Sequence, residues 1–411
     1  MNREKLFSRL TNDSMTIIYS GNLKHMSADA YHEFEVNRNF FYLTGLKKDG
    51  MILLMSKSNT DTSYLFIEEN TELKAKWDGA RMSKEEASKI SGIDVKNIRY
   101  LLEFNDFIKS MMGISRTGTK PATHVYLDLL RRTGFEHLEA HRMADTIRSE
   151  YPELSIKNVE ADLSFLRMFK SYEEVEEISA AIAYTNDGIL NMMVNAEVGL
   201  YEYQIESFYK QSLMFNNTSE SFKTIAASGG NGTTLHYHEN DSMTEENQLI
   251  LCDLGAKSNI YASDITRTFP VNGKFTERQA KLYQIVLDAN KEAIKALKPG
   301  LTWGELNKIA RDILTKGLKD LEIIKEDSEI MKYYYHGIGH FLGLDVHDVG
   351  IYSEPLTEGM VITIEPGLYI AEEKIGIRIE DDILITKDGS MNLSEDIIKE
   401  IKDIELFMSE K

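Results

Sequence analysis

Two aspartates stand in neighbouring strand-like runs of LILCDLGAKSNIYASDITRTF, residues 249–269, and they restrict the fold more than any other feature of the chain. Residues 257–260 lie midway between them and include residues typical of turns. An antiparallel hairpin centred there would place Asp253 directly opposite Asp264, with Cβ atoms ~5 Å apart. Like charges in that position destabilise a strand pair, so this register needs a compensating group, and a cation between the two carboxylates is the simplest one. Alternatively, one aspartate belongs to the turn and the other faces solvent.

A second pair of apolar runs, VITIE and IGIRIE, ends in Glu365 and Glu380. β-branched residues dominate both runs, which is typical of buried strands. A buried glutamate needs a partner, and Arg378 lies on the same face of the strand as Glu380. These residues alone favour a buried arginine–glutamate pair, with a metal ion as the alternative partner.

Five of the ten histidines fall in two glycine-rich segments. HGIGHFLGLDVHDVG contains His336, His340 and His347, and SGGNGTTLHYHEN contains His236 and His238. The first two have the i, i+4 spacing of helical metal ligands, but a glycine costs ~1 kcal/mol in a helix interior, so a loop or strand is favoured. The second segment lacks the lysine of a phosphate-binding loop, which excludes that type of nucleotide site. An isolated histidine is more often a hydrogen-bonding core residue than a ligand, whereas two clusters beside glycines favour function.

Four carboxylates and one imidazole are therefore candidate metal ligands, in the order Asp253, Asp264, His340, Glu365, Glu380. This set is too large for a typical zinc site of three or four ligands. It suits two divalent ions that share bridging carboxylates, with Mn²⁺ favoured by oxygen-rich ligands and Zn²⁺ or Co²⁺ as alternatives. A hydroxide between two such ions is nucleophilic at neutral pH, and Glu365 is the candidate to take its proton and pass it to a leaving nitrogen.

The chain divides into an α/β part over residues 1–164 and an α+β part over 165–411. Five short apolar runs predict buried strands in the first part, at 16–21, 51–56, 63–68, 98–103 and 123–129. The second part begins with a long helix, for which Ser171 is the predicted N-cap and Glu174 completes a capping box. Further helices are predicted at about 276–296 and 303–318, between the two carboxylate-bearing hairpins.

Composition restricts the partners and the compartment. The 66 acidic against 47 basic residues give a net charge of −19, which argues against nucleic acid or an anionic membrane as partner. The single cysteine, Cys252, excludes a disulfide within the chain and favours the cytoplasm. Neither a signal-peptide core at the start nor an apolar run of ~20 residues is present, so we expect no membrane association.

Six segments together resemble the pita-bread metallopeptidases, specifically the aminopeptidase P (Xaa-Pro aminopeptidase) family, of which prolidase is a close relative. They are LHYHEN, LILCDLGA, SDITRTFPV, HGIGHFLGLDVHD, ITIEPGLYI and IGIRIEDDILIT, while FEVNRNFFYLTG and LRMFKSYEEVEEISAA extend the likeness along nearly the whole chain. The resemblance implies an α/β N-terminal domain and an α+β pita-bread catalytic domain with a curved antiparallel sheet. It also implies a dinuclear site formed by the five candidate ligands, with Asp264 and Glu380 touching both ions.

The same resemblance implies roles for other residues of these segments. It implies that His236 and His347 bind substrate and stabilise the tetrahedral intermediate, and that His336 and Arg378 stand beside the ligands or the substrate. Tyr369 lies in the matching EPGLY segment, and Asp345 and Asp348 are expected to be structural or solvated.

The implied activity is hydrolysis of the bond between an N-terminal residue and a following proline by a metal-bridging hydroxide. The expected substrates are peptides with proline at the second position, and a homodimer or homotetramer is expected from the family. The alternatives are a prolidase restricted to Xaa-Pro dipeptides and a non-catalytic pita-bread binding module.

Overall fold

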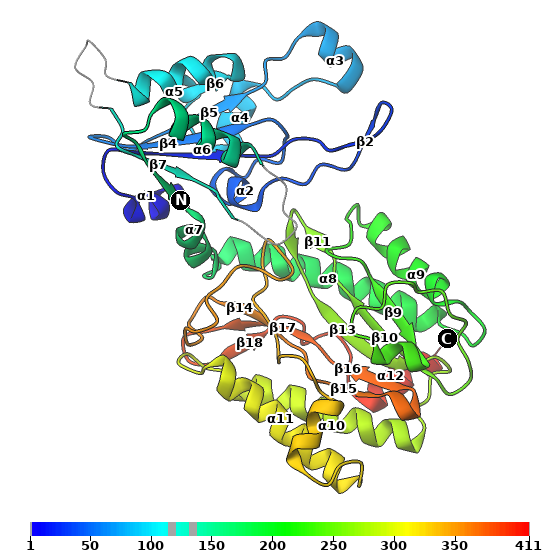
Figure 1. Cartoon of the computed structure of the whole chain (residues 1–411). Coiled ribbons are helices and arrows are strands. Elements are labelled where there is room, and N and C mark those ends of the chain that lie inside the picture. Colours follow the sequence, from blue (N-terminus) through cyan, green and yellow to red (C-terminus); the bar gives the residue numbers. More distant parts are fainter. Residues whose placement is uncertain (1, 114–120, 131–137, 411) are drawn as a thin grey trace. The chain divides into compact units, whose positions relative to one another are not determined.

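The computed structural model describes residues 2–113, 121–130 and 138–410 and divides into two compact units, Met1–Leu166 and Arg167–Lys411. Figure 1 shows both units, the first coloured from blue to dark green and the second from green to red. No helix of the described residues has the length and apolar character needed to span a bilayer.

The first unit is built on a mixed six-stranded sheet. In sheet order its strands are β6 (Ile98–Tyr100), β5 (Thr62–Ile67), β4 (Ile52–Lys57), β1 (Ser14–Tyr19), β7 (His124–Leu127) and β8 (Ser155–Asn158). All five predicted strands are confirmed, but the run at 98–103 is a strand only in its first half, since Leu101–Glu103 forms a 3₁₀ turn. Strand β8 was not predicted because most of its side chains are exposed and it lacks an apolar pattern.

The first unit also contains helices. They are α1 (Asn2–Arg9), α2 (Arg38–Thr44), α3 (Glu72–Asp78), α4 (Lys84–Ser91), α5 (Phe104–Met112), α6 (Glu139–Glu150) and α7 (Glu160–Arg167), and a small β2–β3 hairpin spans His25–Ser27 and Ala30–Tyr31. Apolar side chains of α5 and α6 pack with those of the central strands in one buried cluster, in which the Phe66 and Phe104 rings meet at 5.0 Å. An α/β unit is therefore confirmed.

The second unit holds its strands between two helix pairs, α8 (Tyr172–Asn195) with α9 (Glu202–Phe215) and α10 (Glu277–Ala296) with α11 (Trp303–Asp320), as Figure 1 shows. A last helix, α12, spans Ile401–Ser409. The predicted helix starts are confirmed. Ser171 accepts a hydrogen bond from the backbone of Glu174, and the Glu174 carboxylate accepts one from the Ser171 backbone.

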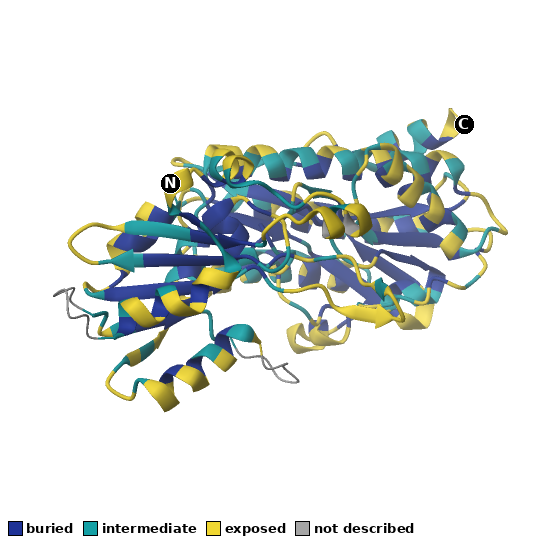
Figure 2. Ribbon diagram, turned by 90° about the horizontal axis from the view of Figure 1, so that it is seen from above, coloured by how far each residue is buried: buried dark blue, intermediate teal, exposed yellow. Residues whose placement is uncertain are grey.

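The strands of the second unit pair in antiparallel fashion and are mostly buried (Figure 2). One sheet has the order β13 (Ile265–Pro270), β10 (Leu249–Leu254), β9 (Ile225–Ser228), and another β14 (Val361–Ile364), β17 (Asp381–Ile385), β18 (Ser390–Asn392). Two short hairpins complete the set, β11 (Lys257–Ser258) with β12 (Tyr261–Ala262) and β15 (Gly367–Ile370) with β16 (Ile375–Arg378).

The predicted register of the first hairpin is wrong by two residues. Asp253 pairs with Thr266, and Asp264 lies just before β13 rather than directly opposite Asp253. The turn is centred one residue later than predicted because Asn259 adopts a left-handed conformation, with φ 58°, that asparagine tolerates well. A shift of two residues preserves the face of a strand, so both aspartates still belong to one face.

The second hairpin is interrupted where its two glutamates stand. β14–β17 and β15–β16 share one register, and counting on by one residue from the pair Ile364 and Asp381 places Glu365 opposite Glu380. At this step the Glu365 backbone N–H donates to the carbonyl of Ile338 at 2.8 Å, and the Glu380 N–H donates to the carbonyl of Thr266 at 3.1 Å. Main-chain hydrogen bonds at Glu365 and Glu380 therefore join this hairpin to the segment of Ile338 and to strand β13.

Candidate metal centre

One cavity of about 190 Å³ in the second unit is lined by every predicted site residue. Its walls also include Leu235, Gly337 and Gly339. The residues come from four places: the 228–242 segment after β9, the β10–β13 hairpin, the 336–348 segment, and the step between β14–β17 and β15–β16. The 336–348 segment forms no helix, as its glycines predicted.

Three overlapping groups of donor atoms in this cavity are close enough to hold cations, because the atoms of each group lie within 4.8 Å of one another. The groups are Asp253–Asp264–Glu380, His340–Glu365–Glu380 and Asp264–His340–His347. The first two share Glu380 and together contain the five candidate ligands. The third adds His347, which sequence analysis assigned to substrate instead.

Burial of several carboxylates at one place shifts their proton affinities. Burial raises the pKa of Asp264 to about 6, and the charge of Asp253 adds to the shift. Burial likewise raises the pKa of Glu365 to about 7 and that of Glu380 well above its usual range. Without cations, the folded protein therefore holds protons here that bound cations would displace.

His340 is oriented by its own hydrogen bonds. Its Nδ1 lies 3.0 Å from the carbonyl of Phe341, and its backbone N–H donates to the Thr363 hydroxyl at 3.0 Å. Nε2 is thus left pointing at the carboxylates, 3.3 Å from Asp264 Oδ2 and 3.8 Å from Glu365 Oε1. Burial alone lowers the pKa of His340, but the hydrogen bond and charge of Asp264 outweigh it and raise the pKa to about 9.

Arg378 is buried and pairs with Asp253 in the β10–β13 hairpin. Its Nη2 lies 2.6 Å from Asp253 Oδ2, whereas its closest atom to the Glu380 carboxylate is 4.0 Å away. The expected pair of Arg378 with Glu380 is present only as a long contact, and Asp253 is the closer partner of Arg378. The Thr266 hydroxyl, which the sequence reading missed, joins these groups: it accepts from Arg378 Nε at 2.9 Å, lies 2.7 Å from Glu380 Oε2, and is 3.2 Å from Asp253 Oδ1. The position of Thr266, two residues after Asp264 on one strand face, was the available signal.

His336 is held as a neutral imidazole. Arg378 donates to the Tyr369 hydroxyl at 3.2 Å, which leaves that hydroxyl free to donate to His336 Nε2 at 2.8 Å. Nδ1–H then donates to the carbonyl of Gly337 at 2.7 Å. Burial and the charge of Arg378 lower the pKa of His336 to about 4.

His347 and His236 also line the cavity, and His347 lies within metal-binding reach of Asp264 and His340. The His347 ring lies 4.1 Å from the ring of His340, and burial together with the charge of His340 lowers the pKa of His347 to about 4. His236 is exposed, and its ring lies parallel to that of His238 with centroids 6.3 Å apart. His347 is therefore a neutral imidazole at physiological pH, as His336 is.

Asp348 anchors the segment that carries these histidines. It is buried, with one oxygen 2.5 Å from Arg167 Nη2 and the other 3.2 Å from Lys170 Nζ. Its backbone N–H donates to the carbonyl of Phe341 at 2.8 Å, which closes the loop. Asp345 pairs with the same arginine at 3.0 Å. Asp348 is therefore structural and not solvated.

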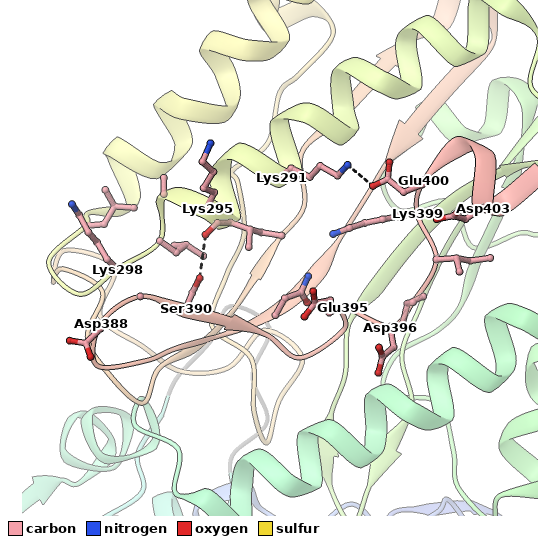
Figure 3. A pocket seen from close by; sticks show the side chains of 18 residues that line it. Lys291, Lys295, Lys298, Asp388, Ser390, Glu395, Asp396, Lys399, Glu400 and Asp403 are labelled. Carbon is pink, nitrogen blue, oxygen red and sulfur yellow. Dashed lines mark hydrogen bonds and ion pairs between the residues drawn. The ribbon is translucent and has the colours of Figure 1, made fainter.

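A larger cavity of about 1030 Å³ lies elsewhere in the second unit, between the end of α10 and the 388–403 segment. Figure 3 shows lysines and carboxylates together along it, including Lys291 paired with Glu400. None of the groups of metal-binding donors found among the described residues lies there. We therefore place the candidate centre in the smaller cavity.

The chain is similar to known proteins along its whole length. The family model of Metallopeptidase family M24 matches residues 176–387, and that of Aminopeptidase P, N-terminal domain, matches residues 1–119. The Xaa-Pro aminopeptidase of Haemophilus influenzae is 34% identical, over 99% of this chain and 96% of that protein. A solved Bacillus anthracis structure assigned as aminopeptidase P has a TM-score of 0.96 and 46% identity, with 100% of this chain and 97% of that one covered. Zinc-substituted Escherichia coli aminopeptidase P in complex with product has a TM-score of 0.90 and 30% identity, with 99% and 97% covered.

Proposed function

The chain belongs to metallopeptidase family M24 and, with its matching amino-terminal domain, to the aminopeptidase P proteins, and from this premise we propose that it removes the N-terminal residue from peptides with proline at the second position. It is thus a metalloaminopeptidase, a hydrolase. The observation that carries the proposal is the one cavity lined by four carboxylates, four imidazoles and a buried arginine.

The residues of the cavity fit two divalent cations. Four carboxylates and the Nε2 atom of one imidazole lie close enough together to bind metal ions. The proposed ligands are Asp253, Asp264, His340, Glu365 and Glu380, of which Asp264, His340 and Glu380 each belong to two groups of donors. Oxygen-rich ligands favour Mn²⁺, with Zn²⁺ and Co²⁺ as alternatives. When bound, such ions supply Lewis acidity that polarises a scissile carbonyl and makes a water more acidic.

Glu365 is proposed as the proton carrier of the reaction. Its carboxylate belongs to the donor group His340–Glu365–Glu380, so it would lie beside a water held by the cations, and a carboxylate in that position can accept and return a proton. We assign to it the proton of the attacking water and the delivery of that proton to the imino nitrogen of the leaving proline. That nitrogen leaves as a secondary amine and needs a proton to do so.

Two imidazoles of the cavity are proposed to bind the substrate carbonyl. An imidazole N–H can donate to the oxygen on which negative charge develops, and we assign this role to His236 and His347. His336, whose two nitrogens are engaged by Gly337 and Tyr369, is assigned to shaping the site. Arg378 is assigned to holding Asp253 and Tyr369 in place.

The test compares two substrates on the full-length protein, with and without a chelator, alongside metal analysis of the purified protein. Cleavage of Xaa-Pro-Yaa peptides that stops on chelation and returns with Mn²⁺ is expected. Cleavage of Xaa-Pro dipeptides alone would instead identify a prolidase. Bound metal without hydrolysis of either substrate would identify a non-catalytic binding module.

We also propose a cytoplasmic homo-oligomer. A lone, buried cysteine is typical of proteins from a reducing compartment. On α3, Leu73 and Trp77 are 69% and 82% exposed and lie one turn apart on a helix face, an arrangement typical of surfaces that bind protein. Light scattering of the purified protein would show a dimer or tetramer.

A further inference from the structure

Glu202, the first residue of α9, is a fully buried carboxylate that accepts five hydrogen bonds. Ser228 donates through its backbone at 2.6 Å and its hydroxyl at 2.7 Å, and the Asn231 side chain donates at 3.0 Å, all to Oε1. The Tyr237 hydroxyl at 2.7 Å and the Ser242 backbone at 3.0 Å donate to Oε2. A buried ionised group is tolerated when its lone pairs are satisfied in this way.

All five donors belong to one segment, residues 228–242, and no cation among the described residues lies within ion-pair distance of Glu202. The carboxylate therefore replaces the strand pairing that this irregular segment lacks after β9 ends at Ser228. Through these five hydrogen bonds the Glu202 carboxylate holds the 228–242 segment in its conformation.

The segment presents His236 to the candidate metal centre. Leu235 and Tyr237, on either side of His236, pack on a small buried cluster that includes Tyr369. The His236 ring itself forms no hydrogen bond with any described residue, so its position depends on the backbone that carries it. We propose that Glu202 is a positioning residue that places His236 against the substrate carbonyl; this inference rests on the proposed function of His236.

Both acceptor oxygens of Glu202 are required, because donors converge on each of them. Glutamine keeps the size of the side chain but has one acceptor oxygen, so either the two donors on Oε2 or the three on Oε1 would face an N–H₂ group. A displacement of the segment by about 1 Å can lower the rate of a positioned reaction by about 100-fold.

The experiment measures kcat and KM for an Xaa-Pro-Yaa peptide with the metal-loaded, full-length protein. We expect Glu202→Gln to lower kcat about 10- to 100-fold, with the same division between kcat and KM as His236→Ala. In the His236→Ala background, Glu202→Gln should have less than about a 3-fold further effect, because it acts through that imidazole. Equal effects in both backgrounds would overturn the proposal.

Glu174→Gln is the matched control. Glu174 is also a buried glutamate in the first turn of a helix, and it also accepts from a tyrosine hydroxyl, that of Tyr261 at 2.9 Å, and from a backbone N–H. It should lower the melting temperature and leave kcat and KM unchanged. If Glu202→Gln fails to fold, Tyr237→Phe is the alternative variant, because it removes one donor to Glu202 and keeps the packed ring. A several-fold lower kcat is expected for Tyr237→Phe, and an unchanged kcat would refute the proposal.

Hydrogen exchange separates this inference from the proposed function. If His236→Ala retains full activity, the assigned role of His236 is wrong whatever Glu202 does. Faster exchange of the 229–242 amides in Glu202→Gln, with exchange elsewhere unchanged, is expected from the anchoring role, and unchanged exchange in this segment would overturn that role.

Discussion

Replacing Thr266 by valine is expected to weaken metal binding although no ligand is removed. The Thr266 hydroxyl accepts from Arg378 Nε at 2.9 Å and donates to Glu380 Oε2 at 2.7 Å. Valine keeps the branched shape at this fully buried position, so the change removes the hydrogen bonds and little else.

The magnitude follows from these contacts. A hydrogen bond to a charged group contributes about 1.5–3 kcal/mol, and a buried donor left without an acceptor costs about 1–3 kcal/mol. Loss of a contact that orients a ligand typically lowers metal affinity about 10- to 100-fold. We therefore expect the Kd for Mn²⁺ to rise by that factor, measured by competition with a chromophoric chelator, and kcat at saturating metal to fall less.

Thr268→Val is the control, because Thr268 is equally buried and is bonded to the backbone of Arg378, at 3.0 and 3.2 Å, without touching a ligand carboxylate. It should lower the melting temperature to a similar degree and leave the Kd for Mn²⁺ unchanged. Equal losses of metal affinity in the two variants, or none in Thr266→Val, would refute the reasoning.

Three further predictions test other parts of the site. Asp264→Ala should abolish both metal retention, read by elemental analysis, and peptide hydrolysis, because this residue belongs to two donor groups; hydrolysis at the unaltered rate would contradict the assignment. The rise in melting temperature on adding Mn²⁺ should be small at about pH 5 and larger at about pH 8, because bound metal must displace the protons of Asp264 and Glu365. The pKa values of both carboxyls are raised on folding, so the folded metal-free protein binds more protons than the unfolded chain and loses stability as pH rises through about 6 to 7. Asp348→Asn should lower the free energy of unfolding in urea by about 3–5 kcal/mol, since Arg167 and Lys170 would stay buried with a weakened partner, and a change below 1 kcal/mol would contradict this.

Local patterns in the sequence predicted most of the strands and the main helix starts, but not β8, and the resemblance to aminopeptidase P predicted which residues share one site. Runs of β-branched residues predicted the strands, and capping residues predicted the helix starts. Because side chains alternate along a strand, Asp253 and Asp264 stay on one face although the predicted register was wrong by two residues. The sequence could not show that Arg378 pairs with Asp253, since that contact joins two hairpins whose docking no local pattern reports. The role of the Thr266 hydroxyl and the five-donor environment of Glu202 were missed for the same reason.

The step at which Glu365 and Glu380 face each other bears on how this protein acquires its ions. The backbone N–H groups of both glutamates donate to the carbonyls of Ile338 and Thr266, so main-chain hydrogen bonds already join the segments that carry the ligands. A zinc finger, in contrast, is unfolded until its metal arrives. We therefore expect this site to be completed by folding and loaded afterwards, so that the ion it holds in a cell follows metal supply as well as ligand preference. Preparations from cells grown on different metals should therefore differ in their ions and share one fold.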